Sequence, residues 1–319
     1  MTDDRDIPPA DLRALARERS RARREHRFAD ADRMRAEIEA QGWNVVDRGA
    51  EARLVRAHPL DVIDPDAVTR YGWSGAVPEV VIDGSPSADA GVGTVAIVLR
   101  ALPEAEATGS LVARLTAGGA APRRILVVAG DDTPDPVVGS PEVVRLRGGV
   151  GPGTLLAVAL RRVAEGTVVV GERWPADATP TDIDTLVARL HDPEVAVTGL
   201  VGQRSRDLRR FAPGGEAGAS VEAVGWAGLA FRARDGRARG PVDEGFGDPE
   251  LLAAWWSLRL RDDPDAGRPR RAVAHRATAA EGDPVSSRDD RATRRDRYRL
   301  IDAFAGRDDL LAMDGGPAT

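Results

Sequence analysis

A glycine-rich run before a helical segment has residue types and spacing that could bind a phosphate group. Such a helix start can hold phosphate through its backbone N–H groups and the helix dipole. The spacing is not a clean G-x-G-x-x-G and a proline interrupts it, so a tight loop that needs positive φ is the competing interpretation. The glycines of this run are Gly148, Gly149, Gly151 and Gly153.

Arginines recur through the first 35 residues at spacings that could contact an RNA backbone. The candidate RNA-binding residues are Arg17, Arg21, Arg24, Arg27, Arg33 and Arg35. The competing interpretation is a solvated helix face, because interleaved acids nearly balance these arginines and could pair with them. Those acids are Glu18, Glu25, Asp30, Asp32, Glu37 and Glu39.

Composition excludes several kinds of chemistry. The chain of 319 residues contains neither lysine nor cysteine, so it has no Walker A lysine, no Schiff-base lysine, no disulfide and no thiolate metal site. The absence of cysteine fits a reducing compartment, and no apolar run approaches the length of a membrane span or a signal peptide. We therefore expect a cytoplasmic protein. The net charge of −6 argues against a surface coated for nucleic-acid binding but leaves room for a local basic patch.

Apolar runs rich in valine and isoleucine alternate with helical segments in the larger part of the chain. The strand-like runs are residues 94–99, 124–128 and 167–170. The helical segments are residues 104–118, 154–165 and 182–190. This alternation indicates an α/β fold whose mostly parallel sheet is covered by helices on both faces. Ligands of such sheets bind at the carboxyl ends of the strands.

The N-terminal 57 residues form a separate pattern. It predicts helices over residues 10–27 and 29–40, with Ala31, Met34 and Ile38 as one buried stripe, and a β-hairpin over residues 43–57. Residues 58–92 are expected to be a connector with an edge strand at residues 80–82, and the loop at residues 83–91 marks the domain boundary. We expect a second domain over residues 93–312 and a disordered tail over residues 313–319.

The N-terminal run resembles the small C-terminal domain of cysteinyl-tRNA synthetases over residues 21–57. The matching pattern is an arginine-rich helix, a Phe-Ala-x-Ala-Asp-x-x-Arg run from Phe28 to Arg35, Gly42, and a hairpin with Val46, Asp47 and Gly49. In that family the region lies near the anticodon end of tRNA, so the resemblance implies an RNA or tRNA partner. It does not imply aminoacylation, because the catalytic motifs of a synthetase are absent.

The larger part resembles the GT-A fold of glycosyltransferase family 2 over residues 93–312. The best matches are residues 191–199, 221–233 and 240–260, the last reading as a Gly-x-x-Asp-Glu-x-Phe turn before a helix. The resemblance implies transfer of a hexose from a nucleoside-diphosphate sugar to an unknown acceptor, with Mn²⁺ or Mg²⁺ on the diphosphate. Three carboxylates are then needed: one for the nucleoside, one for the metal, and one as the base.

The carboxylates that the resemblance calls for are mostly displaced. The nucleoside position has Ala129 and Gly130, with Asp131 and Asp132 just beyond. The metal position has Glu172 alone, followed by Arg173. The base position holds alanine at 253 and 254, and the nearest acids lie upstream. The implied site residues are thus Asp131, Asp132, Arg147, Gly151 and Arg173 for the nucleotide, Glu172 and His275 for a metal, and Asp248 and Glu250 for catalysis.

Two hypotheses follow. The first is a glycosyltransferase-like protein with eroded carboxylates, in which catalysis is weakened, lost, or carried out with arginine in place of the metal. The second is a non-catalytic RNA-associated or scaffold protein that uses the N-terminal arginines. Trp255 and Trp256 could form the floor of a sugar site or pack in the core. After Asp262 we expect a flexible crossing segment and then a final helix over residues 294–304.

Overall fold

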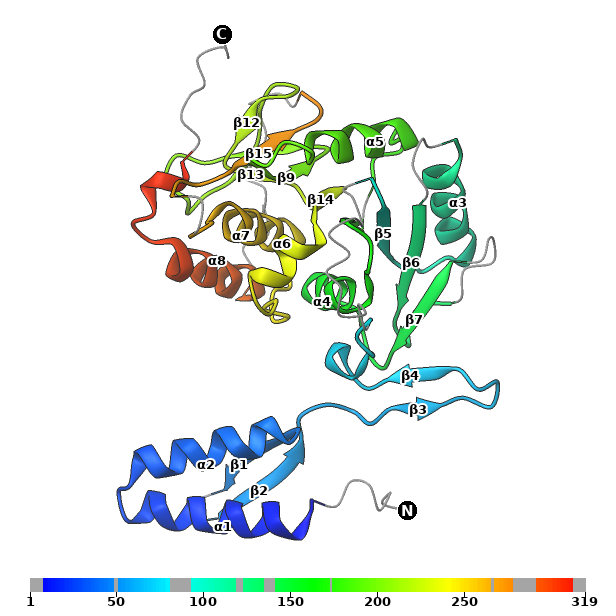
Figure 1. Cartoon of the computed structure of the whole chain (residues 1–319). Helices are drawn as coiled ribbons and strands as arrows, with labels where there is room; N and C mark the ends of the chain where they lie inside the picture. Colours follow the sequence, from blue (N-terminus) through cyan, green and yellow to red (C-terminus); the bar gives the residue numbers. More distant parts are fainter. Residues whose placement is uncertain are drawn as a thin grey trace. The chain divides into compact units, whose positions relative to one another are not determined.

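The computed structural model describes residues 8–48, 51–80, 93–118, 123–134, 141–172, 174–264, 267–277 and 291–311. The chain divides into two compact units, Met1–Trp73 and Ser74–Thr319. Figure 1 shows the elements of both. The division falls earlier than the boundary predicted in the loop at residues 83–91. Residues 74–80 go with the second unit because the backbone of Val77 and Val80 hydrogen-bonds to Arg161 on a helix of that unit.

The first unit contains a pair of helices packed on a β-hairpin. These elements are α1 (Ala10–Arg24), α2 (Phe28–Ala40), β1 (Trp43–Arg48) and β2 (Glu51–Arg56). Leu12 and Ala16 of α1, Ile38 of α2 and Trp43 and Val45 of β1 form its core. The helical hairpin and the β-hairpin predicted from the sequence are confirmed. The buried stripe on α2 is also as expected.

A short second hairpin follows within the first unit. It consists of β3 (Val62–Ile63) and β4 (Thr69–Tyr71), which pair antiparallel. Gly72 follows β4, and glycine is needed there because a Cβ would lie 1.7 Å from the carbonyl oxygen of Pro59. The sequence indicated only a connector here, and the predicted edge strand at 80–82 falls largely outside the described residues.

The second unit has an α/β fold with a large, mostly parallel sheet flanked by helices. The sheet of this unit has the strand order β12-β15-β9-β14-β8-β5-β6-β7. Its strands are β5 (Val95–Arg100), β6 (Arg123–Ala129), β7 (Glu142–Leu146), β8 (Thr167–Gly171), β9 (Val195–Gly199), β12 (Ser220–Val221), β14 (Leu229–Arg232) and β15 (Arg271–Ala274). β14 runs antiparallel between β8 and β9, and β12 runs antiparallel to β15. A small separate sheet contains β10 (Gly202–Arg204), β11 (Ala212–Pro213) and β13 (Ala223–Val224).

Helices cover this sheet on both faces (Figure 1). The helices are α3 (Ala105–Thr116), α4 (Pro152–Arg162), α5 (Pro180–Arg189), α6 (Ala233–Ala238), α7 (Pro249–Arg261) and α8 (Arg291–Phe304), with short 3-10 turns at Ser74–Ala76 and Asp308–Leu310. α3 and α5 pack their leucines against Ile97 and Leu99 of β5, while α4 contacts both α6 and α7 on the opposite face. The predicted strands and helices are therefore confirmed, with ends that differ by a few residues.

Two details of the second unit differ from the sequence analysis or decide between its alternatives. The segment after Asp262 contains β15, which pairs parallel with β9. A strand of four residues with one large apolar side chain, Val273, gives almost no periodic signal, which explains the omission. Trp255 and Trp256 are both buried and stack on each other with ring centroids 5.9 Å apart. Both side chains on α7 therefore belong to the hydrophobic core of the second unit.

Candidate functional site at the carboxyl edge of the sheet

The carboxyl ends of β5, β6 and β8 meet at one edge of the sheet. Leu99 of β5 lies opposite Gly171 of β8, and Arg100 lies opposite Val128 of β6. Glu172 follows Gly171, and Gly130 follows the end of β6. The polar residues after these three strands therefore come together where a parallel sheet binds its ligands.

Arg100 and Glu172 form an ion pair across this edge. An Nη1 hydrogen of Arg100 is donated to Oε1 of Glu172. Both side chains are partly buried, so the interaction is less screened than one at the surface. Glu172 also lines a pocket of about 540 Å³, together with Leu102, Leu111, Arg114 and Trp174 among others. An arginine from the neighbouring strand thus neutralises the carboxylate that the sequence assigned to a metal.

The glycine-rich run is held against the end of β6. The N–H of Gly148 donates to Oδ2 of Asp131 over 2.8 Å, and the N–H of Asp131 donates to the carbonyl of Gly148 over 3.1 Å. A Cβ on Gly130 would lie 2.5 Å from that same carbonyl oxygen. Asp131 therefore fixes the loop through the backbone. Asp132 lies beside it, with Oδ1 2.7 Å from where that Gly130 Cβ would be.

The need for glycine differs among the four glycines of the run. Gly148 has φ of +86°, which favours glycine, and a Cβ on Gly153 would lie 2.7 Å from Cα of Glu244. Among the described residues, Gly149 and Gly151 have no atom within 4 Å of a built Cβ apart from their own chain neighbours. Gly151 is the N-cap of α4. The described part of the chain therefore does not require glycine at 149 and 151, and it leaves space beside the backbone there. Arg147, at the start of the run, is partly exposed.

The two carboxylates expected at the start of α7 have different roles. Asp248 is the N-cap and accepts hydrogen bonds from the N–H groups of Glu250 and Leu251. Oε2 of Glu250 accepts hydrogen bonds from Nε2 of Gln203 over 2.7 Å and from the N–H of Trp226 over 3.1 Å. Burial raises the pKa of Glu250 above its ordinary value. Asp248 is thus a structural cap, and Glu250 is the carboxylate with properties suited to proton transfer.

Glu250 is connected to the edge of the sheet by the segment from Gly225 to Gly228. A Cβ on Gly225 would lie 3.2 Å from Oε2 of Glu250, and a Cβ on Gly171 would lie 2.9 Å from the backbone nitrogen of Gly228 and from Nε1 of Trp174. The same segment therefore contacts Glu250 at Gly225 and the end of β8 at Gly228. Sequence reasoning missed Gln203 and Trp226, which lie far from Glu250 in the chain.

His275 has a structural partner on α5. Its Nε2 lies 2.9 Å from Oδ1 of Asp182 on α5, and Arg276 donates to Oδ2 of Asp182 over 2.9 Å. Burial alone would raise the pKa of Asp182, but hydrogen bonds from Arg276 and Thr179 hold it below its ordinary value. The pair therefore ties the end of β15 to the start of α5.

The residues predicted to hold a metal do not fit that role. Glu172 is neutralised by Arg100, and His275 is occupied by Asp182. Among the described residues no group of three His, Cys, Asp or Glu side chains could hold a metal ion. Arg173 lies outside the described residues. The described side chains at this edge therefore do not form a set of ligands for a divalent cation.

The candidate RNA-binding arginines fall into two groups. Arg27, Arg33 and Arg35 form ion pairs with acids of the same helical hairpin. Arg17, Arg21 and Arg24 instead line a pocket of the first unit. The alternative of a solvated face with paired charges therefore holds for the first group and not for the second.

Comparisons with known proteins give likenesses to solved structures only. No family model and no curated protein matches the chain. Among solved structures it is similar to the mannosyltransferase PcManGT from Pyrobaculum calidifontis in complex with GDP-Man and Mn2+, at 18% sequence identity and a TM-score of 0.42. The match covers 65% of this chain and 61% of that one. At such similarity it says nothing about which residues of this chain act. No helix in the described part of the chain could cross a membrane.

Proposed function

We propose that the second unit binds a nucleoside-diphosphate sugar at the carboxyl edge of β5, β6 and β8 and transfers its sugar to an acceptor hydroxyl. The observation that carries the proposal is the position of Arg100 and Glu172 at the carboxyl ends of β5 and β8, beside the end of β6, which hydrogen-bonds to the glycine-rich run at Gly148. Glu250, at the start of α7, supplies the candidate base. A cation and a helix start suit a diphosphate, and a carboxylate with a raised pKa suits a base.

In this proposal arginine takes the place of the metal. Arg100 keeps one Nη1 hydrogen on Glu172, which holds the guanidinium at the strand ends, and its remaining N–H groups donate to the leaving diphosphate. Arg147, at the loop before α4, supplies further positive charge near the phosphates. The apolar pocket formed by Leu102, Leu111 and Trp174 beside Glu172 offers a surface for the nucleobase or the sugar.

Glu250 acts as the base. One oxygen, Oε2, accepts both hydrogen bonds from Gln203 and Trp226, and Oε1 accepts none from the described residues. The acceptor oxygen forms a bond to the anomeric carbon, and the bond from that carbon to the diphosphate oxygen breaks with its electron pair. The proton of the acceptor hydroxyl passes to Glu250.

A ligand screen tests this function. We expect GDP or UDP, or one of their sugars, to raise the thermal midpoint of the second unit in EDTA as well as in Mn²⁺. A ligand at 100 times its Kd stabilises the folded state by about 2.7 kcal/mol. Release of free sugar from the stabilising donor, measured by chromatography, would then report transfer to water. The proposal is wrong if no nucleoside diphosphate or its sugar stabilises the protein in either condition.

A further inference from the structure

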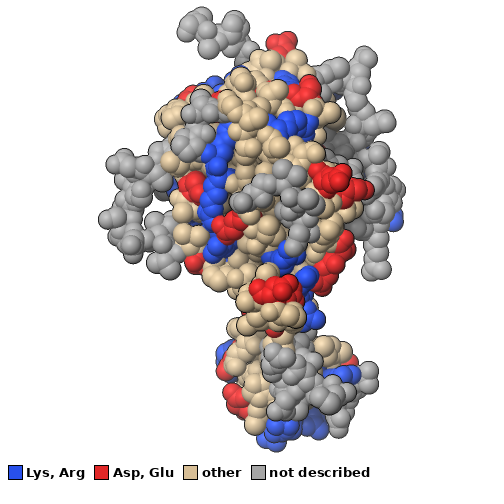
Figure 2. Space-filling view, turned by 90° about the vertical axis from the view of Figure 1, so that its right-hand side faces the viewer, with Lys and Arg blue, Asp and Glu red and all other residues tan. Residues whose placement is uncertain are grey.

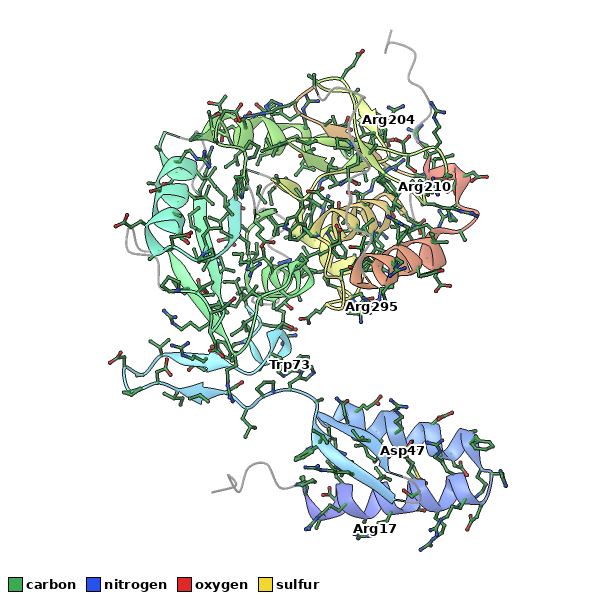
Figure 3. All side chains as sticks on the ribbon, turned by 180° about the vertical axis from the view of Figure 1, so that it is seen from behind. Arg17, Asp47, Trp73, Arg204, Arg210 and Arg295 are labelled. Atoms are coloured by element: carbon green, nitrogen blue, oxygen red, sulfur yellow. The ribbon has the colours of Figure 1, made fainter. Side chains whose placement is uncertain are left out.

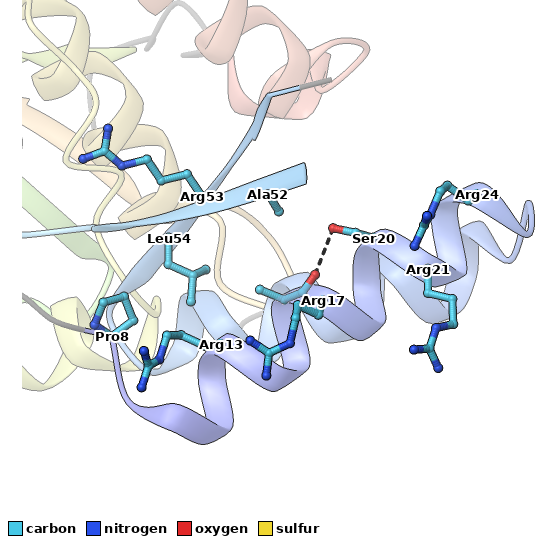
Figure 4. Close-up of a pocket in the computed structure, with 10 residues that line it drawn as sticks. Pro8, Arg13, Arg17, Ser20, Arg21, Arg24, Ala52, Arg53 and Leu54 are labelled. Atoms are coloured by element: carbon cyan, nitrogen blue, oxygen red, sulfur yellow. Dashed lines mark hydrogen bonds between the residues drawn. The ribbon is translucent and has the colours of Figure 1, made fainter. Parts of the chain in front are cut away.

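The first unit contains an arginine-lined groove that the proposed transferase function does not use. The groove lies between α1 and β2 and has a volume of about 810 Å³. Figure 4 shows the side chains that line it. They are Pro8, Arg13, Ala16, Arg17, Ser20, Arg21, Arg24, Ala52, Arg53 and Leu54. We call this feature the arginine groove.

Five arginines line the arginine groove and no acid does. Four come from α1 at spacings of four, four and three residues, which places them on one face of the helix. The fifth, Arg53, comes from β2. None of the five forms an ion pair with a described carboxylate. In Figure 2 basic side chains gather on the lower part of the first unit, where α1 lies.

Two acids of the first unit pair with arginines outside the groove. Asp47 binds Arg19 and Arg23, which lie on other sides of α1. In Figure 3 Arg17 lies on the outer side of α1, whereas Asp47 lies toward the hairpin. Asp30 pairs with Arg27 and Arg33. The five arginines of the groove thus have no carboxylate partner among the described residues, and a bound anion would relieve the mutual repulsion of their guanidinium groups.

The size and lining of the arginine groove identify the class of anion. Arg13 and Arg24 are 11 residues apart on α1, which corresponds to about 16 Å at 1.5 Å per residue. A row of that length matches several successive phosphates and far exceeds one phosphate ion. Guanidinium groups bind phosphate bidentately. No aromatic side chain lines the groove, so stacking on bases does not contribute.

We propose that the arginine groove binds the phosphodiester backbone of a nucleic acid without reading its base sequence. The inference rests on the first unit alone and is independent of the proposed transferase function. Neutralisation of Z phosphates lowers log K by about 0.7Z to 0.9Z per tenfold rise in salt. Five contacts therefore predict a slope of about −3.5 on a single strand and about −4.5 on a duplex.

The test uses the full chain and fluorescently labelled 20-nucleotide probes in anisotropy titrations at several salt concentrations. The probes are single-stranded RNA of two unrelated sequences, single-stranded DNA and duplex RNA. We expect both RNA sequences to bind alike with a steep salt slope, and the other probes tell which backbone is preferred. Vesicles with 30% phosphatidylserine are run in parallel. Binding to the vesicles without binding to any nucleic acid would overturn the proposal.

Matched variants assign the contact to the arginine groove. Arg17→Gln/Arg21→Gln removes two groove charges, and Arg33→Gln/Arg35→Gln removes two paired charges from the same helical hairpin. We expect the first variant to weaken binding at least tenfold and to make the slope shallower by about 1.4 to 1.8. The second should change binding less than threefold. Equal losses in both variants would refute the site.

A third variant guards against an effect on folding. Arg53→Glu acts from the opposite wall of the arginine groove and should weaken binding more than Arg17→Gln/Arg21→Gln does. Far-ultraviolet circular dichroism of all variants should match that of the parent chain. Unchanged binding by a folded Arg53→Glu protein would contradict a ligand that lies between α1 and β2.

Discussion

Replacement of Asp47 by asparagine should loosen the first unit without changing its shape. Asp47 joins β1 to α1 by accepting two hydrogen bonds from Arg19, over 2.7 Å and 3.2 Å, and one from Arg23. Arg19 is only 2% exposed. The asparagine variant removes the charge and turns an NH₂ group toward the guanidinium donors, so the buried cation of Arg19 loses its counterion.

The expected cost follows from these contacts. A hydrogen bond to a charged group contributes about 1.5 to 3 kcal/mol. The side chain of Asp47 is 43% exposed, so solvent screening reduces that contribution. We therefore expect a loss of about 1 to 2 kcal/mol. Hydrogen bonding from Arg19 lowers the pKa of Asp47, so its ionised form stabilises the fold. That contribution is present above the unfolded pKa of about 3.9 and is lost as the pH falls through the lower folded value.

Hydrogen exchange measured by mass spectrometry separates the first unit from the second. At neutral pH, Asp47→Asn should lower the protection of amides in α1 and β1 by about 5- to 30-fold and leave β5 and β6 unchanged, because each 1.4 kcal/mol corresponds to a factor of ten. Asp32→Asn, the same change at an exposed site of α2, is the control and should have little effect. Unchanged protection in Asp47→Asn, or an equal loss in Asp32→Asn, would refute the reasoning.

Three further predictions concern the second unit. Gly153→Ala should destabilise the second unit by about 1 to 3 kcal/mol in denaturant unfolding, because the new Cβ meets the backbone of Glu244. Gly151→Ala, by contrast, should fold normally and weaken nucleotide binding measured by calorimetry. Glu250→Gln should lower sugar transfer at least 100-fold. Because the pKa of Glu250 is raised in the fold, its ionised form destabilises the protein above the unfolded pKa, so this variant should also be more stable than the parent at pH 7. Asp182→Asn should lower stability at pH 7, and its difference from the parent should shrink as the pH falls below 4, because the pKa of Asp182 is lowered in the fold.

Local patterns in the sequence were enough to predict most elements. The buried stripe of α2 and the valine-rich runs of β5, β6 and β8 each repeat over several residues and depend only on their own segment. The mostly parallel sheet follows from their alternation with helices. β15 was missed because pairing with β9 makes it a strand, and that pairing is not visible in four residues.

The site depended on partners that are distant in the chain. Glu172 was expected to be a metal ligand, and only the alignment of β5 with β8 brings Arg100, 72 residues away, onto it. Likewise, the arginines of α1 could not be divided into paired and unpaired groups until Asp47 was placed beside Arg19. Arg53 joined the arginine groove for the same reason. Residue types indicated the chemistry, but long-range packing decided which charges remain available.

Calorimetric titration of the stabilising nucleoside diphosphate into the parent chain and Arg100→Leu, in EDTA and in Mn²⁺, tests the central claim most directly. Our account predicts that the parent binds equally well in both buffers and that Arg100→Leu binds at least tenfold more weakly. Binding that requires Mn²⁺, or that is unchanged in a folded Arg100→Leu protein, would contradict an arginine-based diphosphate site at this edge of the sheet.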